Sequence, residues 1–317
     1  MKQILIPDTA DISEEYTLIR EVTRWTFFAI IVGIVVGLLV GLFLLALEWT
    51  VTKIYAYQYY FLALPLILIM VSLGERNLWR LHNITSTDRV IRAIHHNLKI
   101  GWQSIVKSFI FPLMTISGGG ATGKEAPAAD MGAGIGSLVA RVFRLSETDH
   151  KKLMICGVSA GFSAAFGTPL AGAIFGTEVL FVGNIWYEVL LPSIIAGIVS
   201  FHVSALLGVE FFRPPIFVHP VFSEQFFLFV ILGGIVFGII SFIVVETYNE
   251  LGILYRRWNV PHSIKAFFSG LALIMIGIAL SDDYLGLGFE QIKTILVLGG
   301  APLLAFYFKT LAMAITV

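Results

Sequence analysis

Long uncharged runs of apolar residues alternate with short polar stretches along this chain. The first run, at 25–47, contains 23 residues without a single charge. At a rise of 1.5 Å per residue, a helix of this length extends about 35 Å, which is enough to cross the hydrocarbon core of a bilayer. A shorter apolar run follows at 61–73. The pattern therefore predicts a membrane-spanning helix and a shorter return segment at the start of the chain.

From residue 105 onward the apolar runs become short, and Gly and Pro interrupt them. Half-helices of this kind are tolerated at membrane depth only where neighbouring protein or a water-filled cavity satisfies their exposed backbone groups. The pattern therefore predicts discontinuous helices in a protein-lined region. They are expected at 109–116, 131–139, 153–166, 170–177, 179–187 and 190–207.

The composition supports a membrane protein built only from helices. With 57% hydrophobic and 13% charged residues over 317 positions and a mean hydropathy of +0.87, the chain predicts an all-α polytopic membrane protein. Its single cysteine, Cys156, excludes a disulfide framework and a thiol metal site, and we expect it to be a buried apolar residue. We expect no cofactor, no metal, no nucleic-acid partner and, since no nucleophile and base stand together, no enzyme activity.

Basic residues are concentrated in two loops, which sets the expected orientation. By the positive-inside tendency, these loops and the N-terminus are expected on the cytoplasmic side. The acidic N-terminal segment argues against a cleaved signal peptide, and residues 1–24 are predicted to form a cytoplasmic amphipathic helix. The basic residues are Arg141, Arg144, Lys151 and Lys152 in one loop, and Arg256, Arg257 and Lys265 near the other.

Two pairs of matching segments indicate an internal repeat. GIVVG at 33–37 matches GIVFG at 234–238 at an offset of 201 residues, and KSFI from Lys107 matches KTLA from Lys309 at an offset of 202. With the orientation above, the two halves are inverted. Inverted repeats with broken helices are the architecture of transporters that bind substrate between the halves near the midplane.

The repeat divides the chain unequally. We predict a first transmembrane repeat at 25–222 and a partial second, inverted repeat at 223–317. Position 317 corresponds to position 115 of the first repeat, so a partner of the glycine-rich turn described next would lie beyond residue 317. Either the natural protein continues there, or the gene is truncated.

The stretch GGGATGKEAP at 118–127 places a Lys and a Glu within apolar sequence. Ionisable groups inside a membrane segment are costly and mark substrate or ion paths. Pro127 fits the first turn of a helix that opens at Lys124. Backbone amides and the positive end of the helix dipole at such a start predict an anion site, to which Lys124 adds positive potential. The carboxylate of Glu125 could occupy this site and leave it when protonated. The structural alternative is a turn that only packs helices together.

Two motifs carry a resemblance to the CLC family of chloride channels and chloride/proton antiporters. They are GKEAP at 123–127 and GFSAAFGTPLAGAIFGTE at 161–178. The resemblance implies an inverted-repeat transporter of chloride, a homodimer and a prokaryotic inner membrane. One rival is a fluoride/proton antiporter, suggested by an unmatched serine motif and by FGTP at 166–169. Another is a truncated remnant that does not transport.

The resemblance also implies roles for individual residues. Glu125 takes the place of the gating glutamate, which competes with the anion and carries the proton in antiporters. Thr85 takes the place of an anion-coordinating serine, with Ser86 beside it, so one of these hydroxyls is expected to bind the central anion. The implied anion-binding set is Thr85, Ser86, Gly123, Lys124, Glu125 and Ala126.

The resemblance leaves open how protons would move through this protein. Val179 stands where antiporters commonly carry a second glutamate that relays protons from the cytoplasm. Protons then need another acceptor, or the flux is uncoupled. Asp130 is an unusual acid for its place in the helix. It is interpreted either as a polar group in a water-filled vestibule or as a substitute proton station.

Overall fold

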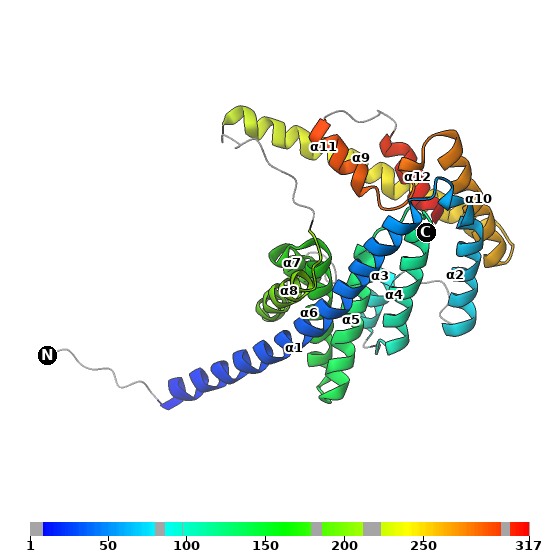
Figure 1. Cartoon of the computed structure of the whole chain (residues 1–317). Helices are drawn as coiled ribbons and strands as arrows, with labels where there is room; N and C mark the ends of the chain where they lie inside the picture. The colour runs from blue at the N-terminus through cyan, green and yellow to red at the C-terminus, as the bar shows by residue number, and fades with distance from the viewer. Residues whose placement is uncertain are drawn as a thin grey trace. The chain divides into compact units, whose positions relative to one another are not determined.

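The computed structural model describes residues 9–79, 86–96, 98–178, 186–211, 223–298 and 305–316, and within these ranges every regular element is a helix (Figure 1). The first half contains α1 (Thr9–Ile54), η1 (Tyr60–Ala63), α2 (Leu64–Trp79), α3 (Ser86–His95), α4 (Trp102–Ser117), α5 (Glu125–Val142), α6 (Glu147–Phe166), α7 (Pro169–Glu178) and α8 (Tyr187–Leu206). The second contains α9 (Glu224–Arg257), α10 (His262–Ala279), η2 (Asp282–Tyr284), α11 (Phe289–Leu298) and α12 (Ala305–Thr316). The predicted all-α class is confirmed.

Within the described residues, four helices are long and apolar enough to cross a membrane. They are Leu18–Ile54 within α1, Tyr187–Leu206, Glu224–Arg257 and His262–Ala279. Between the first two of these in sequence lie α2 to α7, which have 10 to 20 residues each. Gly or Pro stands at the breaks before α5 and α7, as the apolar pattern predicts. The apolar segment expected at 179–187 falls mostly outside the described residues.

Helix α1 is longer than the predicted spanning segment. It runs without interruption from Thr9 to Ile54, whereas the uncharged run covers only 25–47. The polar residues that precede this run include no Gly or Pro after Pro7, so helix propensity extends the helix beyond the apolar segment. The predicted boundary after residue 24 is therefore not a break in the helix. The division into repeats at 25–222 and 223–317 stays a prediction.

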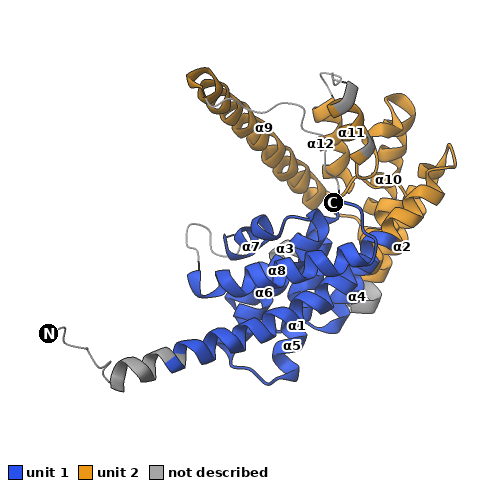
Figure 2. Cartoon of the chain, turned by 60° about the vertical axis from the view of Figure 1, so that its left-hand side comes forward, with its two compact units in different colours: residues 1–45, 83–109, 124–211 blue, residues 46–82, 110–123, 212–317 orange. Residues whose placement is uncertain are grey.

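The chain folds as two compact units (Figure 2). The first comprises residues 1–45, 83–109 and 124–211, and its closest packing joins α5, α6, α7 and α8. The second comprises residues 46–82, 110–123 and 212–317, and in it α10 packs against α2 and α12. The chain passes from the second unit to the first between Gly123 and Lys124, within the predicted anion-binding stretch.

Backbone contact between α5 and α6 organises the first unit. A Cβ atom added to Gly157 would lie 2.0 Å from the carbonyl oxygen of Gly132, and the reciprocal distance is also 2.0 Å. No side chain fits at either position, so the two glycines let the helices touch. This contact fixes the position of α5, the helix that begins with Glu125, against α6.

Replacing Gly157 with alanine should destabilise the protein by about 2–3 kcal/mol, because the new methyl group meets backbone that cannot move aside. The matched control is Gly238→Ala in α9, where an added Cβ meets nothing within 4 Å. Since alanine favours helix over glycine by about 1 kcal/mol, the control should be neutral or stabilising. Thermal unfolding of both variants in detergent measures the difference. Equal melting temperatures would contradict the close packing.

The core of the second unit surrounds the glycine-rich turn. Ala121, within this turn, is fully buried, as are Leu64 of α2 and Leu273 of α10. These residues belong to one cluster, which consists of Phe61, Leu64, Leu68, Ala121, Leu273, Ile276, Leu285 and Ala312. The turn ahead of Lys124 is thus part of a packed core.

Candidate functional site

Glu125 is the first residue of α5, as the sequence predicts. Lys124 is the N-cap residue. The first hydrogen bond of the helix runs from the Ala128 amide to the Lys124 carbonyl at 3.2 Å. Pro127 has no amide hydrogen. Amides in the first turn of a helix have no intrahelical acceptor, and those of Glu125 and Ala126 donate to no backbone carbonyl in the described part of the chain. The helix start therefore presents two amides and a half-buried carboxylate.

The preceding glycine turn uses its own amides internally. Those of Gly118, Gly119, Gly120 and Thr122 donate to the carbonyls of Met114, Ile116, Thr115 and Gly120 at 2.8–3.0 Å. The Ala121 amide donates to the Thr316 hydroxyl at 3.1 Å. The glycines therefore shape the turn, and amides for an anion are left only from Gly123 onward. The predicted amides of Gly123, Lys124 and Ala126 lie beyond this turn, and the anion-binding set stays a prediction.

Two tyrosines support the turn within the second unit. The hydroxyl of Tyr55 donates to the Ile116 carbonyl at 3.0 Å, and its ring stacks on Tyr60 with centroids 4.1 Å apart. Burial raises the pKa of Tyr55 well above its usual range. The phenol thus keeps its proton and remains a hydrogen-bond donor to the end of α4.

Asp130 lies inside the first unit with no solvent exposure. Its Oδ2 accepts a hydrogen bond from Ser108 of α4 and a longer one, at 3.4 Å, from Ser104 one turn earlier on the same helix. Full burial does not fit the interpretation of Asp130 as a solvated group in an open vestibule. A proton station at this position stays a prediction.

Glu125 and Asp130 share a helix but do not face each other. Five residues of α-helix rotate a side chain by about 140° around the helix axis. A proton that moves between these two carboxylates would need a water molecule or a hydroxyl group as an intermediate.

The other predicted residues are only partly described. Ser86 is the first residue of α3, which packs against α5 in the first unit. Thr85 and Val179 lie outside the described residues. Glu178 is the exposed last residue of α7.

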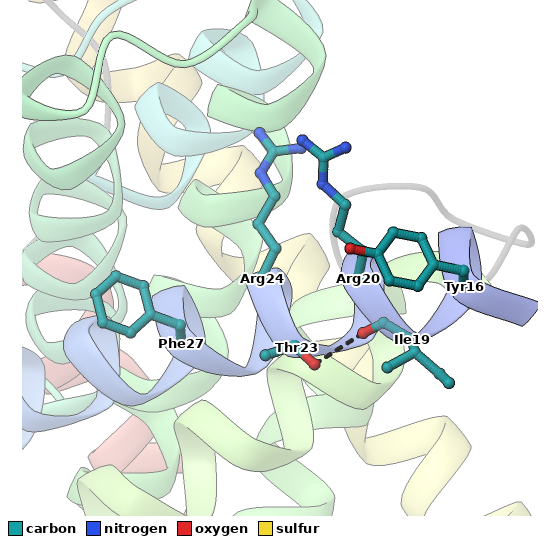
Figure 3. Close-up of a pocket in the computed structure, with 6 residues that line it drawn as sticks. All are labelled: Tyr16, Ile19, Arg20, Thr23, Arg24 and Phe27. Carbon is teal, nitrogen blue, oxygen red and sulfur yellow. Dashed lines mark hydrogen bonds between the residues drawn. The ribbon is translucent and has the colours of Figure 1, made fainter.

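Cys156 is buried and unbridged, as predicted, and its sulfur lies 3.8 Å from the Ser193 hydroxyl. No cluster of three His, Cys, Asp or Glu residues that could hold a metal occurs among the residues the structure describes. A shallow surface pocket follows the polar start of α1, where Arg20 and Arg24 point to the same side of the helix (Figure 3). It includes none of the predicted site residues. Its lining consists of Tyr16, Ile19, Arg20, Thr23, Arg24 and Phe27.

Comparison with known proteins identifies the family. The model of the family described as voltage gated chloride channel matches residues 78–317. A "Chloride/fluoride channel protein" of Pseudomonas syringae pv. tomato is 28% identical over 293 residues, which cover 88% of this chain and 63% of that protein. The chain thus spans less than two thirds of this relative.

Two solved structures share the fold. A CLC-type fluoride/proton antiporter superposes with a TM-score of 0.85 at 22% identity, over 93% of this chain and 75% of that one. A slow cyanobacterial Cl⁻/H⁺ antiporter gives a TM-score of 0.77 at 19% identity, over 92% and 73%. Because the family match covers most of the chain, this protein belongs to the voltage-gated chloride channel (CLC) family, a family of multi-pass membrane channels and ion antiporters.

The sequence did not point to several residues that build the turn. Tyr55 and Thr316 are distant in sequence from the residues they bind, and no local pattern marks them. The sequence did mark Lys309, because this residue matches Lys107 in the internal repeat. Ser104 and Ser108 could be found only once α4 and α5 were known to pack together.

Proposed function

We propose that this protein moves chloride across a membrane, as a channel or chloride/proton antiporter, with Glu125 as the gating glutamate. The observation that carries this proposal is the start of α5. There a carboxylate side chain stands beside two first-turn amides that lack a backbone acceptor. Such a helix start favours an anion, and the Glu125 carboxylate is an anion tethered next to it.

Glu125 can act as a gate because its carboxylate and chloride compete for the same position. When Glu125 is ionised, its carboxylate can occupy the position that chloride would take. Protonation removes the charge, and the first-turn amides then favour the mobile anion. The anion-binding set in this proposal is Gly123, Lys124, Glu125 and Ala126 at the start of α5, together with a hydroxyl from Thr85 or Ser86.

A second candidate substrate is fluoride. The relative from Pseudomonas syringae is named a chloride/fluoride channel protein, and the structure with the higher of the two TM-scores is titled a fluoride/proton antiporter. The serine motif expected for chloride coordination is also unmatched at Ile84–Asp88. These observations favour testing both halides.

Halide efflux from liposomes decides between the two substrates. The reconstituted protein, loaded with equal chloride and fluoride, should release chloride at least about tenfold faster, a difference of about 1.4 kcal/mol between the two barriers. Ion-selective electrodes record both ions from one preparation, and liposomes without protein give the leak. Faster fluoride release would favour the second candidate, and no release of either ion above the leak would reject anion transport.

We further propose the inner membrane of a prokaryote as the location, with the N-terminus in the cytoplasm. The basic residues Arg141, Arg144, Lys151 and Lys152 at the junction of α5 and α6 support this orientation. A homodimer in the lipid bilayer completes the proposal, with protons as a second transported species in the antiporter case.

A further inference from the structure

Lys309 on α12 places its ammonium group among three consecutive backbone carbonyls. The Nζ atom donates to the carbonyl oxygens of Tyr284 and Leu285, each at 3.2 Å, and of Gly286 at 2.7 Å. An ammonium group has three donors, so this turn satisfies all of them. Hydrogen bonds from a charged donor are stronger than those between neutral groups. Lys309 therefore fastens the 284–286 turn to α12.

Thr316 lies two helical turns beyond Lys309, on the same side of α12. A spacing of seven residues returns to the same face of a helix. The Thr316 hydroxyl accepts a hydrogen bond from the Ala121 amide at 3.1 Å and donates to the Ala312 carbonyl at 2.8 Å. One face of α12 thus binds the 284–286 turn with Lys309 and the glycine turn with Thr316.

A third hydrogen bond joins the two turns directly. The Gly286 amide donates to the Gly119 carbonyl at 2.9 Å. Both glycines have positive φ angles, +58° and +98°, which other residues adopt only with strain. A Cβ atom on Gly286 would also lie 2.1 Å from the Tyr55 hydroxyl. The three segments, α12, the 284–286 turn and the 118–121 turn, are each bonded to the other two, and we call this arrangement the clamp.

We propose that Lys309 and Thr316 are positioning residues that act through the clamp to fix the backbone leading into Glu125. The clamped segment ends at Ala121, and only Thr122 and Gly123 separate it from Lys124. The positions of the last amides before α5 therefore depend on the clamp. Its effect on transport rests on the proposed function of Glu125, whereas the clamp itself does not.

Hydrogen–deuterium exchange of the full chain tests the clamp without any transport assay. Lys309→Met removes the charged donor and keeps a chain of similar length. Peptides covering 282–290 and 115–123 should both exchange about tenfold faster or more than in the wild type, while 125–166 should not change. Lys53→Met, at an exposed lysine in the last turn of α1, is the control. Faster exchange confined to 282–290, or no change, would overturn the proposal.

Thr316 provides a second pair of variants in case Lys309→Met does not fold. Thr316→Val keeps the side-chain shape but removes the acceptor of the Ala121 amide, whereas Thr316→Ser keeps the hydroxyl. The valine variant should speed exchange at 115–123 and leave 282–290 closer to the wild type, and the serine variant should restore slow exchange. Equal exchange in the two variants would overturn the proposal.

Transport kinetics then distinguish positioning from simple stability. In liposomes, Thr316→Val should raise the KM for the anion about fivefold with a smaller change in maximal rate, and Thr316→Ser should behave as wild type. Unchanged KM with accelerated exchange would overturn the positioning role. If the wild type shows no anion flux, the proposed function fails, and the exchange data still decide whether the clamp exists.

Discussion

Replacing Glu125 with glutamine should make anion flux nearly independent of pH. In the wild type, the ionised carboxylate competes with the anion at the start of α5, and protonation removes the competitor. A carboxyl group changes its protonated fraction by up to about tenfold per pH unit. The wild-type flux should therefore rise as the pH falls, by up to a similar factor. Glutamine has the same shape and no titrating proton. Initial efflux from liposomes at pH 4.5 to 7.5, spaced by about one pH unit, measures both profiles.

A matched control uses another glutamate in the first turn of a helix. Glu224 begins α9 and is exposed, far along the sequence from the anion-binding stretch. Glu224→Gln should retain the pH profile of the wild type. An unchanged profile in Glu125→Gln would reject the gating role. Loss of pH dependence in both variants would show that it does not arise from Glu125 alone.

The helices of this protein could be predicted because local sequence determines them. An apolar run indicated α2, runs cut by Gly and Pro indicated α4 to α7, and Pro127 marked the first turn of α5. The polar α3 was not indicated by any apolar run. The helices expected at 1–24 and 25–47 form one continuous helix, α1, because no Gly or Pro separates them. Membrane hydropathy marks the apolar part of such a helix, and helix propensity continues it through the polar residues before that part.

The sequence predicts candidate site residues only where they lie together in one short segment. GKEAP carries a local signal, since the glycine, the two charges and the proline lie within five residues. The surroundings of the glycine turn depend on residues far away in sequence, such as Tyr55, Gly286 and Thr316. Nothing in a single sequence states which distant hydroxyl meets a given amide. The hydrogen bond between the Ala121 amide and the Thr316 hydroxyl, 195 residues apart in sequence, is an example.

Asp130 is the remaining acid whose position suggests a role in proton movement. A buried carboxylate is costly unless hydrogen bonds compensate for lost water, and Ser104 and Ser108 both donate to it. The resemblance leaves Val179 in place of a relay glutamate, so coupled flux would need another proton acceptor. We therefore propose that, where flux is proton-coupled, Asp130 is the station on the path that replaces the missing glutamate.

Asp130→Asn should abolish the response of the reversal potential to a proton gradient. Asparagine keeps the shape and an oxygen that can accept from Ser108, so the fold should persist while the titrating proton is lost. For exchange of one proton per anion, the wild-type reversal potential should shift by about 30 mV per pH unit, half of the 59 mV per tenfold gradient of a single charge. Ser104→Ala, which keeps the hydrogen bond from Ser108 to Asp130, should retain this shift. No shift in the wild type would reject coupling, and a shift that persists in Asp130→Asn would reject Asp130 as the station.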